Sequence, residues 1–118
     1  MSDKKRSSVV NSKSSSALVY VTAKNTRQAM RIGRTVVMEK LAACANSLGP
    51  IRSVYLWNGA LQQEHEVILL LKTRRTLVKK LAARIAELHS YKIPCVVSVD
   101  IDDGHAPFLD WIQLQTAD

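Results

Sequence analysis

The chain of 118 residues is 47% hydrophobic and carries a formal net charge of +7. This length suffices for one domain and excludes several, and no stretch approaches the roughly 20 consecutive apolar residues that a membrane-spanning helix needs. The basic surplus permits contact with nucleic acid, but no recognition motif or interleaved aromatic residue accompanies it. We therefore expect neither a nucleic acid nor a membrane as a partner.

The N-terminal segment differs in composition from the rest of the chain. Residues 1–16 are rich in serine and lysine, and their one apolar pair is Val9-Val10. Such a segment buries too little apolar surface to offset the entropy lost on ordering. We expect a flexible basic tail over 1–16 and a single domain over 17–118. The tail lacks the apolar stretch of a secretory signal, which favours a cytoplasmic location.

The first half of the domain should form a strand, a helix and a second, bent strand. Ala17–Ala23 is an apolar run typical of a buried strand. Asn25 can cap a helix that we expect over Thr26–Leu41, because apolar residues recur there at helical spacing. Cys44–Trp57 should follow as a strand that bends at Gly49-Pro50.

A hairpin is the clearest local feature of the sequence. Asn58-Gly59 tolerates positive φ and separates two β-prone segments, as in a two-residue hairpin turn. The return strand, Leu61–Thr73, would span about 43 Å at about 3.3 Å per residue. A domain of this size is too small to cover such an arm, so we expect other copies of the chain to cover it.

The second half should supply a helix, a strand and a closing helix. Thr73 can cap a second helix, whose apolar stripe runs from Leu77 to Leu88. Cys95–Ile101 should be a fourth strand, and Ala106–Leu114 should be a short C-terminal helix.

The order strand, helix, strand, strand, helix, strand is that of an α+β, ferredoxin-like split βαβ fold (βαββαβ), here with an extra C-terminal helix. Right-handed crossovers put both helices on one face of the sheet. The other face has no helix to cover it, so an apolar surface there should pack against further copies of the chain.

Several spaced motifs lie between about Ala17 and Gln115. They are VTA at 21–23, EKLAACAN at 39–46, SVYLWNG at 53–59, Glu64 and Glu66, LKT at 71–73, HSYKIP at 89–94, and WI at 111–112. In this order they resemble the CutA family of divalent-cation-tolerance proteins. The resemblance implies a ferredoxin-like subunit, a tightly packed homotrimer, a cytoplasmic home in bacteria, and a link to copper and other divalent metals.

Three positions depart from the family pattern. Val21 stands where members with a copper-binding proposal carry a cysteine at the end of the first strand. Cys95 follows Pro94 where many members have glutamate, and Ser90 replaces the proline of the family's usual HPY segment. A metal site that uses the first-strand cysteine therefore cannot exist in this chain.

His89 and Cys95 are the candidate metal ligands. An imidazole nitrogen and a thiolate would suit copper or zinc if the two side chains lie close together. Two ligands do not complete a site, which usually needs three or four. The alternative is that His89 interacts with the dipole at the end of the second helix. We expect no obligatory cofactor, with copper or another divalent metal as an optional ligand.

Trp57, Tyr91 and Glu64 are the candidate residues of a ligand cleft between subunits. Alternation along the strand puts Glu64 and Glu66 on one face and His65 on the other. The alternative roles are packing for the aromatic rings, and pairing with basic residues of a neighbouring copy for the two glutamates.

Enzyme motifs are missing from the sequence, which has neither a P-loop nor a GxSxG nucleophile turn. We expect a non-enzymatic, trimeric cytoplasmic protein associated with tolerance to divalent metals, copper above all, through weak metal binding. The alternative is a trimeric signalling or scaffold module that binds a small ligand in clefts between its subunits.

Overall fold

The computed structural model describes residues 15–117 of the chain. Its elements are β1 (Ser16–Ala23), α2 (Thr26–Met38), β2 (Cys44–Trp57), β3 (Ala60–Arg74), α3 (Val78–Leu88), β4 (Val96–Asp100) and α4 (Ala106–Gln115). The expected tail over 1–16 lies outside the described residues except for its last two, of which Ser16 opens β1. No helix within 15–117 is long and apolar enough to cross a membrane.

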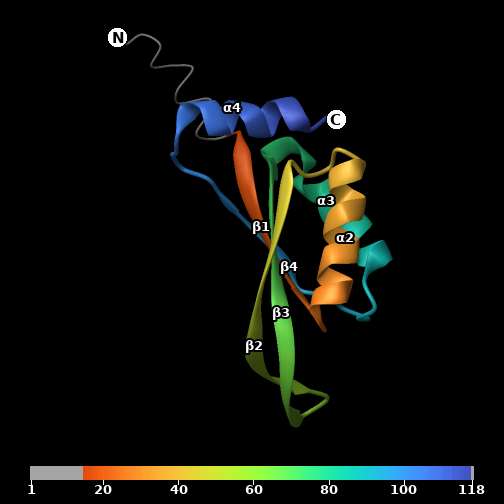
Figure 1. Ribbon diagram of the computed structural model, residues 1–118. Coiled ribbons are helices and arrows are strands. Elements are labelled where there is room, and N and C mark those ends of the chain that lie inside the picture. The colour runs from red at the N-terminus through yellow and green to blue at the C-terminus, as the bar shows by residue number, and fades with distance from the viewer. Residues whose placement is uncertain (1–14, 118) are drawn as a thin grey trace.

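The four strands form one antiparallel sheet in the order β2-β3-β1-β4. β1 lies between β3 and β4, as the split βαβ arrangement requires. α2 and α3 lie on the same face of this sheet (Figure 1). The expected α+β, ferredoxin-like fold with an extra C-terminal helix is therefore confirmed.

The hydrophobic core lies between the sheet and these two helices. Its largest fully buried side chains on these helices are Ile32, Val36, Leu81 and Ile85. Gly33 allows α2 to approach the sheet closely, because a Cβ added there would lie 2.9 Å from the Cβ of Ala45 on β2. Aliphatic side chains fill this core, as the small number of aromatic residues predicts.

Helix α2 ends at Met38, earlier than the expected end at Leu41. Lys40 has a positive φ of 63°, and the Leu41 amide donates to the Val36 carbonyl at 2.9 Å. This is a Schellman motif, with lysine in the left-handed position where glycine is most common. Because no glycine occurs at this position, the sequence contains no stop signal, and helical periodicity alone placed the end of the helix too late.

Thr73 does not cap the second helix, contrary to the expectation from sequence. It lies in β3, and its buried hydroxyl donates to the Leu41 carbonyl at 2.7 Å. A short 3-10 turn, Arg75–Leu77, leads into α3, and no side-chain hydrogen bond caps either helical start. The strand runs further than expected, so the hydroxyl satisfies a buried carbonyl of the α2–β2 connection instead.

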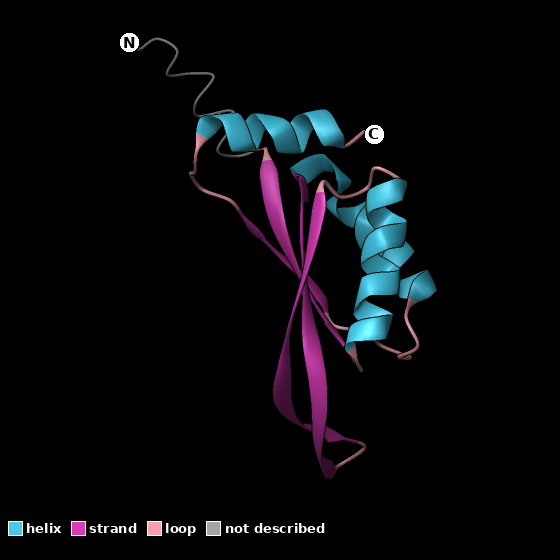
Figure 2. Cartoon of the chain, viewed as in Figure 1, coloured by secondary structure: helices cyan, strands magenta, loops and turns pink. Residues whose placement is uncertain are grey.

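The strands β2 and β3 extend beyond the rest of the sheet as a two-stranded ribbon, residues 51–66, which we call the arm (Figure 2). β1 pairs with β3 only from Val67 onward, so within 15–117 the arm strands pair with each other alone. β2 bends at Gly49-Pro50, where its register with β3 shifts, and Asn58 and Gly59 close the turn with φ of 52° and 79°. The arm gives the molecule its elongated extents of 56 × 26 × 22 Å.

One face of the sheet carries no helix. Leu18 and Tyr20 of β1 meet Leu70 of β3 and Val97 and Val99 of β4 there, around a shallow apolar hollow. The two valines are 57% and 61% exposed. α4 crosses the end of the sheet instead of covering this face (Figure 1). The described part of the chain therefore leaves an apolar surface open to water.

Candidate functional site

The base of the arm holds a buried carboxylate with two hydroxyl donors. Glu66 is 7% exposed. Ser53 Oγ donates to its Oε1, and Tyr91 Oη donates to its Oε2 at 2.7 Å. Ser53 lies on β2 and Tyr91 in the loop between α3 and β4, so three separate segments meet here. Each carboxylate oxygen has a donor, as a buried carboxylate requires.

Two tyrosine hydroxyls lie among the glutamates of this cluster. Partial burial, followed by the hydrogen bond to Glu66, raises the pKa of Tyr91 above its usual value. Partial burial, followed by the charge of Glu64 and a hydrogen bond to it, raises the pKa of Tyr55. Both phenols therefore stay protonated and keep their donors well above neutral pH.

His89 positions the loop that carries Tyr91. The Nε2 of the His89 ring donates to the Thr22 carbonyl at 2.8 Å, and the Tyr91 amide donates to Nδ1 at 3.1 Å. The His89 and Tyr91 ring centroids lie 4.5 Å apart. Because both ring nitrogens are engaged, this arrangement leaves neither one open to a metal ion.

Cys95, the second metal candidate, lies just before β4 and is exposed. Among residues 15–117, no three His, Cys, Asp or Glu side chains gather as metal ligands.

Within one copy, two of the three residues expected to line a cleft between subunits lie in this cluster. Tyr91 and Glu64 belong to the same cluster, since the charge of Glu64 acts on the Tyr91 hydroxyl. Trp57 pairs with Ala60 beside the hairpin turn and is 45% exposed. No contact described for residues 15–117 joins Trp57 to Tyr91, because one side chain lies at the tip of the arm and the other reaches its base.

Sequence reasoning gave neither Ser53 nor Tyr55 a role in this cluster. The hairpin register contains the missing signal. Once the turn is fixed at Asn58-Gly59, counting back from it pairs Ser53 with Glu64 and puts Tyr55 on the same face of the arm.

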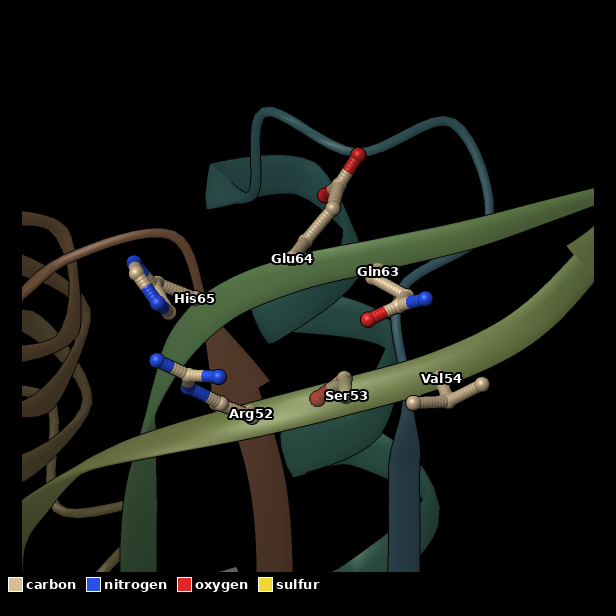
Figure 3. A pocket seen from close by; sticks show the side chains of 6 residues that line it. All are labelled: Arg52, Ser53, Val54, Gln63, Glu64 and His65. Carbon is tan, nitrogen blue, oxygen red and sulfur yellow. The ribbon is translucent and has the colours of Figure 1, made fainter.

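The opposite face of the arm carries Arg52 and His65 beside exposed apolar side chains. Arg52 and His65 are register partners across the two strands, and Val54 and Gln63 form the next pair on that face. An open hollow of about 260 Å³ is lined by Arg52, Ser53, Val54, Gln63, Glu64 and His65 (Figure 3). Arg52 and His65 lie side by side in Figure 3, whereas Glu64 points away from both.

The arrangement of the sheet, the arm and its flanking motifs is matched in known proteins. The family described as CutA1 divalent ion tolerance protein matches residues 17–115. The chain belongs to this family. The Divalent-cation tolerance protein CutA of Pyrococcus horikoshii is 37% identical over 99 residues, which cover 84% of this chain and 96% of that protein. The crystal structure of CutA1 from Oryza sativa superposes with a TM-score of 0.86 at 34% identity, covering 91% of this chain and 98% of that one.

Relatives in the family differ in length and in location. Protein CutA, chloroplastic, of Arabidopsis thaliana is 37% identical over 101 residues, which cover 86% of this chain but only 56% of the plant protein. The chain thus spans about half the length of that relative. The names of these relatives describe tolerance to divalent cations or a chloroplast location and not an enzyme activity. Family membership does not fix the compartment, so a cytoplasmic location stays a prediction.

Proposed function

We propose that this chain works as a homotrimer that supports tolerance to divalent metals, with copper as the first candidate, through weak metal binding. The main observation in favour of a trimer is that large apolar side chains on the arm are exposed to water. Val54, Leu56 and Leu61 are 63%, 69% and 60% exposed. A projecting two-stranded ribbon with such side chains is poorly stable in water by itself.

Assembly would remove this apolar surface from water. Fully burying one valine or leucine side chain contributes roughly 1.5–3 kcal/mol. The uncovered sheet face, with Val97 and Val99, offers a second apolar surface within the same chain. A closed ring of copies, in which each copy donates its arm and receives another, would bury both surfaces at once.

The metal ligands would then come from more than one copy. Copper and zinc sites usually use three or four ligands, and residues 15–117 of a single copy gather no such set. Among the metal-ligating side chains that the sequence analysis singled out, the Cys95 thiol and the Glu64 carboxylate are exposed. His89 could bind a metal only by giving up its bonds to Thr22 and Tyr91, so we assign Cys95 the larger part.

Native mass spectrometry tests both parts of this proposal. We expect a trimer that takes up about one copper or zinc ion per subunit, and zinc removes the ambiguity of thiol oxidation by copper. Cys95→Ser should lose the metal, whereas the matched control Cys44→Ser should keep it. A monomer would refute the assembly. A trimer that stays metal-free would refute direct metal binding and leave the architecture standing.

A second candidate function is the binding of a small ligand between subunits. The observation that favours it is the cluster at the base of the arm, where Tyr55, Tyr91, Glu64 and Glu66 combine aromatic faces with negative charge. Such a lining suits a cationic ligand. In a Trp111→Phe background, ligand binding should change the fluorescence of Trp57. A flat response across cationic metabolites would count against this function.

A further inference from the structure

We propose that the outer surface of α2 and α3 binds the phosphate backbone of double-stranded nucleic acid without reading its base sequence. The contacts come from the exposed cationic side chains of a helix layer, which we define as residues 24–40 and 78–88. The helix layer is separate from the arm and from the cluster around Glu66. The proposal requires neither metal binding nor assembly into a trimer.

The fold gathers the positive charge of the chain on the helix layer. The layer carries eight basic and two acidic side chains, a net charge of +6, whereas the whole chain carries +7. The exposed basic residues of the layer are Lys24, Arg27, Arg31, Arg34, Lys40, Lys79 and Lys80. Because α2 and α3 lie on the same face of the sheet (Figure 1), this charge acts on one side of the molecule and attracts polyanions.

Helical spacing aligns three arginines along the side of α2 that faces away from the sheet. Arg27, Arg31 and Arg34 follow one another at intervals of four and three residues, so they lie on one side of the helix. Ile32 and Val36, which pack into the core, lie on the other side. At 1.5 Å per residue, the row of arginines extends over about 10 Å along the helix axis.

The acidic residues of the helix layer do not neutralise these arginines, because both already pair with Arg84. Arg84 Nη2 lies 2.8 Å from Glu39 Oε2, and Arg84 Nη1 lies 3.0 Å from Glu87 Oε1. Within residues 15–117, neither Arg27 nor Arg34 has an ion-pair or side-chain hydrogen-bonding partner. Their guanidinium groups are therefore available to a ligand.

Another copy of the chain is a poor occupant of the helix layer. Two such layers carry the same charge and repel each other. Of the exposed large hydrophobic side chains within 15–117, α2 contributes only Met38 and α3 contributes none. The apolar surfaces that assembly would bury are the arm and the uncovered sheet face, which is on the other side of the sheet from the helices (Figure 1). The helix layer therefore stays open to solvent in the proposed trimer.

The chemistry of the helix layer favours a duplex backbone over other polyanions. The guanidinium fork matches two oxygens of a phosphate, and a duplex offers one negative charge per about 1.7 Å of its axis. Few exposed apolar side chains are present to enter a membrane surface, and the layer has no aromatic residue to stack on single-stranded bases. The sequence holds no recognition motif, but binding to the backbone alone needs none.

Fluorescence anisotropy of a labelled DNA duplex of about 20 base pairs, titrated with the full chain at several salt concentrations, tests the site. Contacts from Arg27, Arg31 and Arg34 predict that the logarithm of the association constant falls with the logarithm of salt concentration, with a slope of about −3. The double variant Arg27→Gln/Arg34→Gln removes two contacts. It should lower the magnitude of the slope by about 2 and weaken binding by about tenfold or more at about 0.1 M salt.

The matched control is Lys4→Gln/Lys5→Gln, which removes the same charge from the N-terminal segment. Its affinity and salt slope should equal those of the wild type. Equal weakening by the two double variants, or no saturable binding of the duplex, would overturn the proposal. Vesicles of phosphatidylcholine with phosphatidylserine, and polyglutamate, are parallel probes. Tighter binding to either one than to the duplex would identify a membrane or an acidic protein as the partner and would also overturn the proposal.

Discussion

At the scale of single residues, Glu66 is the centre of the candidate site. A buried carboxylate is costly unless its oxygens are satisfied, and here two hydroxyls from separate segments satisfy them. Tyr91 is the donor that crosses from the α3–β4 loop to the arm. Its hydroxyl therefore links the position of that loop to the position of the arm.

Replacing Tyr91 with phenylalanine should destabilise the fold by about 1–2 kcal/mol, because Glu66 loses one of its donors while it remains buried. Urea unfolding of the variant and the wild type measures this difference. Tyr20→Phe is the control, since Tyr20 lies on the uncovered sheet face, far from Glu66 in the sheet register. An equal loss in both variants would contradict the assigned role.

The same hydroxyl should make stability depend on pH in the alkaline range. The pKa of Tyr91 is raised in the folded chain, so above about pH 10 the unfolded chain releases a proton that the folded chain still holds. This contribution to stability is complete below pH 10 and falls as pH rises further. The stability difference between wild type and Tyr91→Phe should therefore shrink between pH 8 and pH 11, as urea unfolding at each pH can measure.

At the scale of elements, the end of α2 is set by Lys40 in the left-handed region. A side chain with a Cβ pays a steric cost in this region that glycine avoids. Lys40→Gly should therefore stabilise the fold by about 0.5–1 kcal/mol, measured by thermal or urea unfolding. Lys40→Ala retains the Cβ and should give no such gain. Equal stability of the glycine and alanine variants would show that the backbone strain is negligible.

The contact between α2 and β2 should respond in the opposite sense to a change at Gly33. Alanine normally stabilises a helix interior by up to about 1 kcal/mol relative to glycine. Here the new methyl group would lie 2.9 Å from the Ala45 Cβ and 3.4 Å from Leu69 Cδ1, so the strand must shift. We expect Gly33→Ala to lower the free energy of unfolding by about 1 kcal/mol or more. A stabilised variant in urea unfolding would contradict this packing argument.

At the scale of the whole molecule, the arm and the uncovered sheet face are apolar surfaces that a single copy of the chain leaves exposed to water. Leu61→Asp places a charge on the arm and should therefore dissociate the proposed homotrimer, as light scattering after size-exclusion chromatography can detect. Met38→Asp is the matched control, because Met38 is 82% exposed but lies at the end of α2. A trimer that survives Leu61→Asp would remove this part of the arm from the interface.

Local chemistry explains which elements could be predicted. The hairpin turn at Asn58-Gly59 and the cap at Asn25 follow from residues that favour one backbone conformation, and both are confirmed. The prediction for the end of α2 was wrong because Lys40 gives no local sign of its positive φ. Thr73 was misassigned because a threonine can serve a helix start or a buried carbonyl equally well.

The sequence by itself determined the order of elements, the alternation of side chains along the arm and the family, since all of these depend on neighbouring residues and spacing. Only the tertiary structure decided which side chains meet. Tyr91 reaches Glu66 across a sequence separation of 25 residues, and His89 reaches the Thr22 carbonyl across 67. Such contacts depend on sheet register, strand twist and the path of a loop, which no local pattern encodes.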